Sequence, residues 1–260
     1  MLVQYSSDIH LECLKILPEI KVMADVLCIA GDIGDPYTDI YAQFLIKLSV
    51  LYKKVFIITG NNDYYSSIHS VERPSITDTD SQINFVIQSH ELDNITFLNN
   101  SSEEYEGYIF VGGTLWSDIS SLSESDTLYR SDFTRISELT FENYNILHQK
   151  SVEYIKYITA KTHCEAQSDK NYLSKKMIII THHLPTYLLM KTPLKTEQEV
   201  TRSKFYASHC DYLFEKPITA WIYGHTHIPG IELINNIQFV SNPRCNTIKH
   251  NTITFAVLEV

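Results

Sequence analysis

Short apolar runs, rich in β-branched residues, alternate along the chain with amphipathic or polar stretches. Residues 26–30 (VLCIA) and 55–59 (VFIIT) are two such runs, and neither alternates with polar residues. Continuous apolarity is typical of strands in a sheet that is covered on both faces. Between these runs, Ile40, Phe44 and Leu48 recur at helical spacing. The pattern therefore predicts a strand–helix–strand unit.

The rest of the chain continues the alternation. Further strands are predicted at residues 2–5, 95–98, 108–111, 177–180, 220–223 and 252–260. A helix is predicted over residues 141–160, a long polar loop over 117–132, and a tight hairpin turn at Asn235-Asn236. The sequence has no internal repeat and no linker, so we expect one domain over residues 1–260. Periodicity alone leaves two arrangements open, a sandwich of two sheets or one large sheet flanked by helices.

Composition limits the class of protein. The 260 residues are 44% hydrophobic and 20% charged, which suits a sizeable core and excludes wholesale disorder. Lys and Arg number 21 against 31 for Asp and Glu, so the formal net charge is −10. Such a chain is a poor non-specific binder of long nucleic acid or of an anionic membrane. It can still bind an anionic ligand if a metal supplies the positive charge.

The cysteines and the N-terminal residues indicate a compartment. The five cysteines are odd in number and widely scattered, which argues against a disulfide framework and a cysteine-based zinc site. No basic region followed by an apolar core opens the sequence, and no apolar stretch approaches the roughly 20 residues of a membrane span. We expect a cytoplasmic protein without a membrane segment.

Side chains that can bind metal follow five of the predicted strands within a few residues. In chain order they are Asp8 and His10, then Asp32, then Asn61, then His182, and finally His225 and His227. In open α/β sheets the ligand-binding crevice lies at the carboxyl ends of the strands, so we expect these groups to converge.

The spacing within each cluster has a physical rationale. Asp8 and His10, like His225 and His227, are two residues apart, and in extended chain such pairs point to the same side. Glycine directly precedes Asp32, Asn61 and His225, where it allows a tight turn and close backbone approach. A single pair of this kind is weak evidence, but all five clusters in order, each after a strand, strongly indicate one metal centre.

Five sequence blocks carry a resemblance to a known family. The blocks are residues 8–10 (DIH), 31–35 (GDIGD), 60–63 (GNND), 181–183 (THH) and 224–227 (GHTH). Together they resemble the motifs of the calcineurin-like metallophosphoesterases. The resemblance implies an α/β fold, a four-layer α/β/β/α sandwich of two mixed β-sheets flanked by helices. Residues 115–118 (LWSD) and 241–244 (SNPR) resemble a small cytoplasmic branch of that family.

The resemblance also implies a dinuclear metal site. One ion would be held by Asp8, His10, Asp32 and His227, and the other by Asp32, Asn61, His182 and His225. The mixture of imidazole, amide and carboxylate ligands favours Mn, with Fe or Zn as alternatives. Two such ions can generate a bridging hydroxide at neutral pH and clamp a phosphoryl group. The expected partner is a small phosphorylated substrate, a class that includes nucleotides. The oligomeric state stays open.

The third block departs from the family pattern. Most members have a histidine where this chain has Asn62, and that histidine assists the leaving oxygen. An amide can donate a hydrogen bond but cannot deliver a proton, and general acid help contributes roughly 10²–10⁴ in rate. Some phosphodiesterase branches also lack the histidine, so the change favours phosphodiester or nucleotide-type substrates. Asn62, His183 and Asp63 are the candidate catalytic residues.

Candidate residues for substrate binding are Arg244, Asn62 and Arg135, because guanidinium matches phosphate oxygens in geometry. For any one arginine, a surface salt bridge is the ordinary alternative. Residues 117–135 are expected to form a mobile rim of the cleft.

Two other readings stay open beside a phosphodiesterase. One is a phosphomonoesterase or protein phosphatase of the same fold. The other is a degenerate metal-binding scaffold that acts through protein contacts, which Asn62 favours slightly and the full set of metal ligands disfavours. A nuclease of this fold is disfavoured by the acidic charge.

Overall fold

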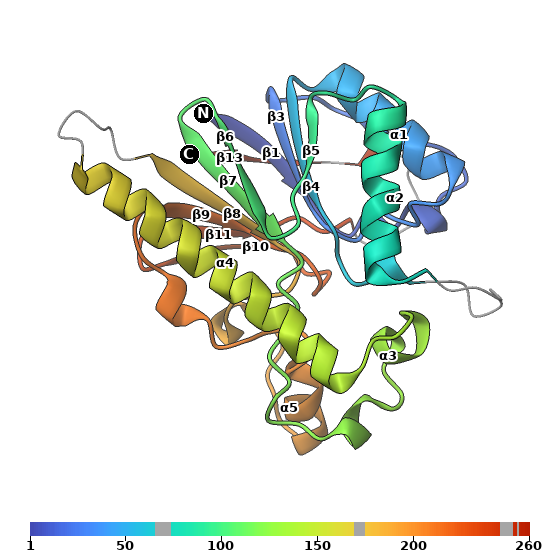
Figure 1. Cartoon of the computed structure of the whole chain (residues 1–260), viewed down its shortest axis with the longest axis vertical. Coiled ribbons are helices and arrows are strands. Elements are labelled where there is room, and N and C mark those ends of the chain that lie inside the picture. Colours follow the sequence, from blue (N-terminus) through green and yellow to red (C-terminus); the bar gives the residue numbers. More distant parts are fainter. Residues whose placement is uncertain (66–73, 169–174, 245–251, 254) are drawn as a thin grey trace.

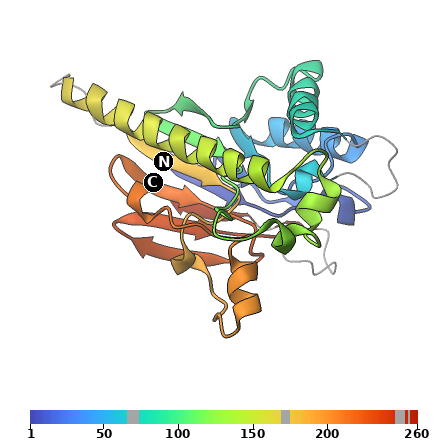
Figure 2. The same cartoon turned by 60° about the horizontal axis from the view of Figure 1, so that its bottom comes forward.

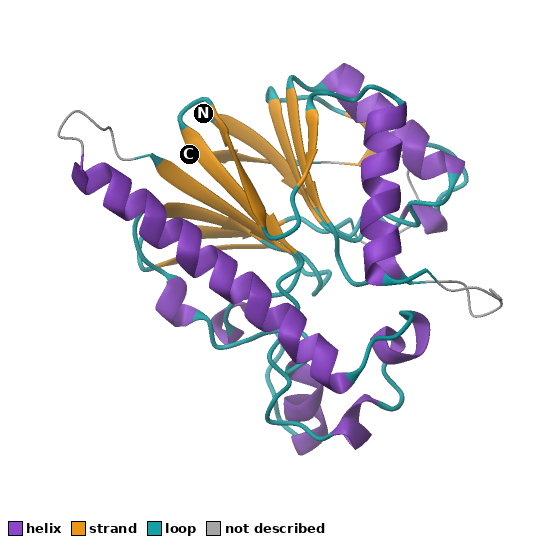
Figure 3. Ribbon diagram, in the orientation of Figure 1, coloured by secondary structure: helices purple, strands orange, loops and turns teal. Residues whose placement is uncertain are grey.

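Two β-sheets stacked face to face form the centre of the molecule (Figures 1 and 3). The computed structural model describes residues 1–65, 74–168, 175–244, 252–253 and 255–260. The first sheet has strand order β13-β1-β3-β4-β5, and the second has order β10-β11-β9-β8-β7-β6. Both sheets are mixed. In the first sheet the edge strand β13 is antiparallel to β1 and the other pairings are parallel. In the second sheet both edge strands, β10 and β6, are antiparallel to their neighbours and the central pairings are parallel.

The strands and helices have the following bounds. The first sheet contains β1 (Leu2–Ser6), β3 (Val26–Ala30), β4 (Lys54–Ile58), β5 (Ile95–Phe97) and β13 (Ala256–Glu259). The second contains β6 (Ser101–Tyr105), β7 (Tyr108–Gly113), β8 (Lys176–Thr181), β9 (Ile218–Ile222), β10 (Gly230–Ile234) and β11 (Ile237–Ser241). The short strands β2 (Glu19–Ile20) and β12 (Thr252–Ile253) pair with each other. The α-helices are α1 (Asp39–Leu51), α2 (Ile76–Ser89), α3 (Ser131–Arg135), α4 (Phe141–Ser168) and α5 (Glu197–Ser203).

Each central strand is buried on both faces, which explains the continuous apolar runs. In β3, Leu27 and Ile29 pack with α1 and α2, while Val26, Cys28 and Ala30 face the second sheet. Strand β8 divides in the same way between the inner layer and α4. Figure 2 shows α4 lying along the outside of the second sheet. The expected four-layer α/β/β/α sandwich is therefore confirmed.

The hairpin and most strands agree with the sequence-based prediction, and two expectations need correction. Asn235 and Asn236 adopt φ 51° and 61° between β10 and β11, as a tight hairpin turn requires. The single strand predicted over 252–260 is instead two short strands in different sheets. The segment 117–132 is not one irregular loop, because it contains a 3₁₀ turn at Glu124–Thr127 and enters α3.

Helices α2 and α5 were not predicted, although their N-termini carry a recognisable signal. Ser75 and Asp78 form a capping box at α2, and Thr196 and Glu199 form one at α5. Helices α3 and α5 lie beyond one end of the two sheets (Figure 1), and the loops that carry the candidate ligands leave the strands toward that end. Within the described residues, no helix is long and apolar enough to cross a membrane.

Candidate metal centre

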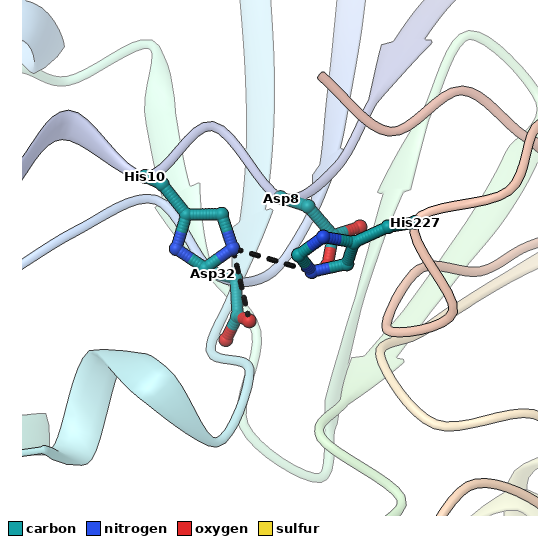
Figure 4. A group of neighbouring side chains, drawn as sticks. All are labelled: Asp8, His10, Asp32 and His227. Carbon is teal, nitrogen blue, oxygen red and sulfur yellow. Dashed lines mark hydrogen bonds and ion pairs between the residues drawn. The ribbon is translucent and has the colours of Figure 1, made fainter. Parts of the chain in front are cut away.

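Four side chains from three separate loops meet in a tight group. Asp8 and His10 follow β1, Asp32 follows β3, and His227 comes from the loop after β9. One potential ligand atom from each residue lies within 4.8 Å of the others. His227 Nε2 is 3.1 Å from Asp8 Oδ1 and 3.4 Å from His10 Nε2, and His10 Nε2 is 3.6 Å from Asp32 Oδ2 (Figure 4).

A second group of donors adjoins the first through Asp32. His182 Nε2 lies 3.4 Å from Asp32 Oδ2, and His225 Nδ1 lies 3.2 Å from His182 Nε2. The Oδ1 atom of Asn61 is buried and has no hydrogen-bond partner among the described residues. Asp32 Oδ2 is thus the atom that faces imidazoles from both groups.

Three histidines each have one ring nitrogen engaged outside the centre. His10 Nδ1 lies 2.7 Å from Glu12 Oε1, His182 Nδ1 2.8 Å from the Ala30 carbonyl, and His225 Nε2 3.2 Å from the Phe205 carbonyl. Each acceptor favours a proton on the nitrogen that faces it. The other nitrogen then presents a lone pair toward the centre, which is the arrangement that orients histidines in metal sites.

The backbone at these ligands is not extended. Asp8, His10, Asp32, His225 and His227 all have positive φ values, of 52°, 51°, 54°, 70° and 56°. The prediction that Asp8 with His10, and His225 with His227, lie in extended chain is therefore wrong. Left-handed turns bring the side chains together instead. Non-glycine residues adopt this conformation at an energetic cost, and such costs concentrate at functional sites.

Two glycines are required where loops from neighbouring strands cross. A Cβ atom at Gly60 would lie 2.1 Å from Asp32 Oδ1, and one at Gly31 would lie 2.4 Å from the Gly60 nitrogen. Gly31 also has φ of 81°. The close approach of these two loops brings Asp32 and Asn61 into one site.

Asp63 fastens the same two loops together. Its buried carboxylate accepts hydrogen bonds from the backbone N–H groups of Asp32 at 2.8 Å, Gly34 at 2.8 Å and Gly60 at 2.7 Å. Burial and the charge of Asp32 raise the pKa of Asp63 to about 7, although these hydrogen bonds oppose the shift. These contacts show that Asp63 holds the two loops together, and its catalytic role stays a prediction.

Electrostatics separate the buried donors into charged and neutral groups. Burial by itself opposes ionisation of Asp32, but the charge of His182 and a hydrogen bond from it hold the pKa of Asp32 well below its usual range. Burial disfavours charge on His182 as well, yet Asp32 raises the pKa of His182 to about 9. Burial and the charge of His182 lower the pKa of His225 to about 3. A divalent cation would stabilise the same carboxylates without requiring protons on the imidazoles.

Asn62 lies at the edge of the centre, and His183 lies behind it. Asn62 donates to both Asp32 oxygens, from its backbone nitrogen at 2.8 Å and its side-chain nitrogen at 2.7 Å. His183 is fully buried, with Nδ1 3.3 Å from the Thr114 carbonyl and Nε2 3.4 Å from the Tyr144 hydroxyl. Its burial, with the neighbouring charge of His225, holds the pKa of His183 well below its ordinary value. Its ring packs 4.2 Å from that of His225, so it supports a candidate ligand from behind.

The two candidate substrate arginines occupy different surroundings. Arg244 donates to the Ile9 carbonyl at 2.8 Å, between the two candidate ligands of the first loop. Arg135 lies over the ring of Tyr65, with its guanidinium carbon 4.5 Å from the ring centre. Arg244 thus contacts the backbone of the loop that carries Asp8 and His10, while Arg135, at the end of α3, contacts Tyr65.

Sequence reasoning missed Asp132, which lies in the predicted polar loop. Its carboxylate is 7% exposed and accepts hydrogen bonds from Asn61 Nδ2 at 2.8 Å and the Tyr65 hydroxyl at 2.5 Å. These bonds turn the amide so that Asn61 Oδ1 is left for another partner. The segment 117–135 therefore borders the centre, but the fully buried Ile119 anchors it. No local pattern marks Asp132, since one more Asp in a polar stretch carries no signal.

Comparison with known proteins agrees with this geometry. The chain matches the family model described as calcineurin-like phosphoesterase over residues 6–229. It is 28% identical over 268 residues to an uncharacterized protein, L509, of Acanthamoeba polyphaga mimivirus, and the match covers 93% of this chain and 90% of that protein. The phosphopantetheinyl hydrolase PptH of Mycobacterium tuberculosis has a similar structure, with a TM-score of 0.66 and 14% identity, over 93% of this chain and 88% of that one. At that identity the structural similarity concerns the fold alone.

Proposed function

The chain belongs to the calcineurin-like phosphoesterase family, and we propose that it hydrolyses phosphodiesters or nucleotide-type phosphate esters at a dinuclear metal centre. Membership, together with the convergent donors, supports metal-dependent hydrolysis of a phosphoester. The preference for diesters and the two-ion assignment are the finer parts of the proposal. We also propose that the whole chain acts as one domain in the cytoplasm.

The unpartnered Asn61 Oδ1 is the observation that carries the two-ion assignment. Buried polar atoms are nearly always satisfied, and an unsatisfied one costs roughly 1–3 kcal/mol. Asn61 directly follows Gly60, whose loop meets Asp32, and His182 and His225 each have their other ring nitrogen engaged. We propose a cation as the partner that would fit the amide oxygen and both imidazoles. We assign Asp8, His10, Asp32 and His227 to one ion, and Asp32, Asn61, His182 and His225 to the other.

The donor set favours a borderline transition metal. Imidazole and carboxylate together suit Mn, Fe or Zn better than Ca or Mg, and we propose Mn. Two divalent ions, when bound, would lower the pKa of a coordinated water and offset charge on the phosphoryl oxygens. The chain supplies Asp32 Oδ2 as the shared carboxylate oxygen between the two ligand groups.

The residues near the centre support the proposal that the enzyme prefers phosphodiesters to phosphomonoesters with poor leaving groups. Asn62 can hydrogen-bond a phosphoryl oxygen but carries no titratable proton. His183 is fully buried and faces Thr114 and Tyr144, so it is poorly placed to protonate a leaving oxygen. We propose that Asn62 binds and orients the phosphoryl group, with Arg244 and Arg135 contributing to its binding. A phosphomonoesterase of the same fold is the competing function, and faster turnover of a monoester than of a diester would favour it.

Reconstitution tests the proposal. Metal-free protein would be loaded with Mn, Fe, Zn or Mg, its metal content measured, and each form given bis(p-nitrophenyl) phosphate and p-nitrophenyl phosphate. We expect two ions per chain, with faster turnover of the diester. Asp32→Asn should lose both metals and activity, while Asp35→Asn, which changes a carboxylate in the same loop, should keep both. One ion per chain under saturating metal would overturn the dinuclear assignment, and metal binding without turnover of either ester would favour the degenerate scaffold.

A further inference from the structure

A groove of about 330 Å³ opens beside the candidate metal centre. It lies between the loop after the 3₁₀ turn at Tyr187–Leu189, helix α5 and the loop that carries the last two histidine ligands. Thr226, which stands between His225 and His227, forms part of its wall. Tyr206 forms another part, and its ring centre is 4.7 Å from that of His225. A substituent of a phosphate bound at the centre can therefore extend into this groove.

The lining combines an apolar body with the cationic side chain of Arg202. Met190, Leu194, Ile228 and the Tyr206 ring supply most of its surface, which suits an aromatic or apolar group. Arg202, in the last turn of α5, is exposed at the groove.

The other charged groups of the lining are engaged within the protein. Lys191 forms an ion pair with Glu232. Glu199 accepts the backbone N–H groups of Lys195 at 2.7 Å and Thr196 at 2.9 Å. Within the described parts of the chain, by contrast, no carboxylate forms an ion pair with Arg202. Its guanidinium can therefore donate hydrogen bonds to a ligand anion. Two of its N–H groups are arranged to bind a phosphate or a carboxylate in a bidentate manner.

We propose that this groove binds one ester substituent of the substrate, and that the substituent has an aromatic or apolar body with a second anionic group held by Arg202. The inference rests on the proposed phosphoesterase function and adds the substrate class: a nucleotide-sized ester that carries an anion besides the reacting phosphate. The volume is at the lower end of the range for small-molecule sites, so the body has about the size of a nucleoside.

Three chromogenic esters with the same leaving group test the groove. Apart from the shared leaving group, methyl p-nitrophenyl phosphate carries only a methyl group, which is too small to fill it. Thymidine 5′-(p-nitrophenyl phosphate) fills it without an added anion, and the 3′-phosphorylated form of that ester adds the anion. We expect KM to fall at each step, by about tenfold for the added phosphate, because a charge-assisted hydrogen bond is roughly that strong.

Variants distinguish the effect of Arg202 from the effects of overall charge and of the apolar lining of the groove. Arg202→Gln should remove the preference for the 3′-phosphorylated ester and leave hydrolysis of the methyl ester unchanged. Lys191→Gln is the matched control, since it removes a neighbouring cation that is already paired, and it should keep the preference. Leu194→Asp should raise KM for both nucleoside esters and leave the methyl ester unaffected. Equal KM for the two nucleoside esters, or equal effects of the two Gln variants, would overturn the proposal.

Binding keeps this test separate from the proposed activity. Thymidine 3′,5′-bisphosphate and thymidine 5′-monophosphate would be titrated into the metal-loaded protein by calorimetry. About tenfold tighter binding of the bisphosphate, lost in Arg202→Gln, supports the groove even if no ester is hydrolysed. If none of the three esters is hydrolysed, the result counts against the proposed function, whereas equal binding of the two nucleotides counts against the groove.

Discussion

Asp132 offers a direct test of how the centre is positioned, because its carboxylate accepts a hydrogen bond from one candidate ligand, Asn61. Replacing Asp132 with Ala removes the oxygen that accepts hydrogen bonds from Asn61 Nδ2 and from the Tyr65 hydroxyl. The Asn61 amide can then rotate, so that Oδ1 is no longer held in the position from which we propose that it binds an ion. We expect weaker binding of the ion assigned to Asn61, with the ion at the other ligand group little changed.

The size of the effect follows from the geometry. Removing a partner that orients a metal ligand typically lowers the affinity for the metal by about 10–100-fold, which corresponds to roughly 1.4–2.8 kcal/mol of binding free energy. Both hydrogen bonds converge on a single oxygen, so the carbonyl oxygen of Asn can accept them too. Burial already raises the pKa of Asp132, and a neutral amide suits that environment. Asp132→Asn should therefore retain metal affinity within about threefold, since the loss is one of charge and not of orientation.

Calorimetric titration of the metal-free protein with Mn²⁺, together with metal content and thermal unfolding, measures these effects. Asp126→Ala is the control, because it removes an exposed carboxylate from the same segment, with its contacts at Ser123. Equal affinities of the second ion in Asp132→Ala and Asp126→Ala would refute the positioning role. Equal losses in Asp132→Ala and Asp132→Asn would show that charge, and not the hydrogen-bond geometry, is what matters.

Three further predictions address the loop crossing, the pH dependence of stability and the leaving group. Gly60→Ala should abolish binding of both ions, because its Cβ would lie 2.1 Å from Asp32 Oδ1; metal content checks this, and a fully loaded variant would contradict it. Burial raises the pKa of Asp80 to about 6, so its contribution to folding is largest at low pH and is lost as the pH rises through 6. Asp80→Asn should therefore gain stability relative to wild type between pH 4 and 7, by up to about 3 kcal/mol. Denaturant titrations at several pH values measure this, and the same pH dependence of the free energy of unfolding in both proteins would refute it. Asn62→His should narrow the ratio of kcat/KM between aryl and alkyl phosphodiesters by about tenfold, because it restores a proton donor; an unchanged ratio would mean that no acid is missing at this position.

Much of the fold and the ligand set could be predicted from local sequence. Strand β3 is apolar at every position because both of its faces are buried. Its lack of apolar–polar alternation therefore indicates that layers cover the sheet on both sides. Donors that follow parallel strands meet at one edge of a sheet, and this rule predicts that Asp8, Asp32 and Asn61 lie together. The hairpin at Asn235-Asn236 was predictable for a similar reason, since asparagine tolerates positive φ there.

The remaining features depend on contacts between distant segments. Asp132 and Asn61 are 71 residues apart, and only packing of α3 against the centre turns an ordinary carboxylate into the acceptor that orients a candidate ligand. The left-handed backbone at Asp8 and His10 likewise arises where their loop hydrogen-bonds to the loop of Gly31 and Asp32. Hydrophobic periodicity reports how much of an element is buried, but it carries no information about which polar group from elsewhere will face it. That partner is decided by tertiary packing, because burial requires each polar atom to be satisfied by whatever group the fold brings beside it.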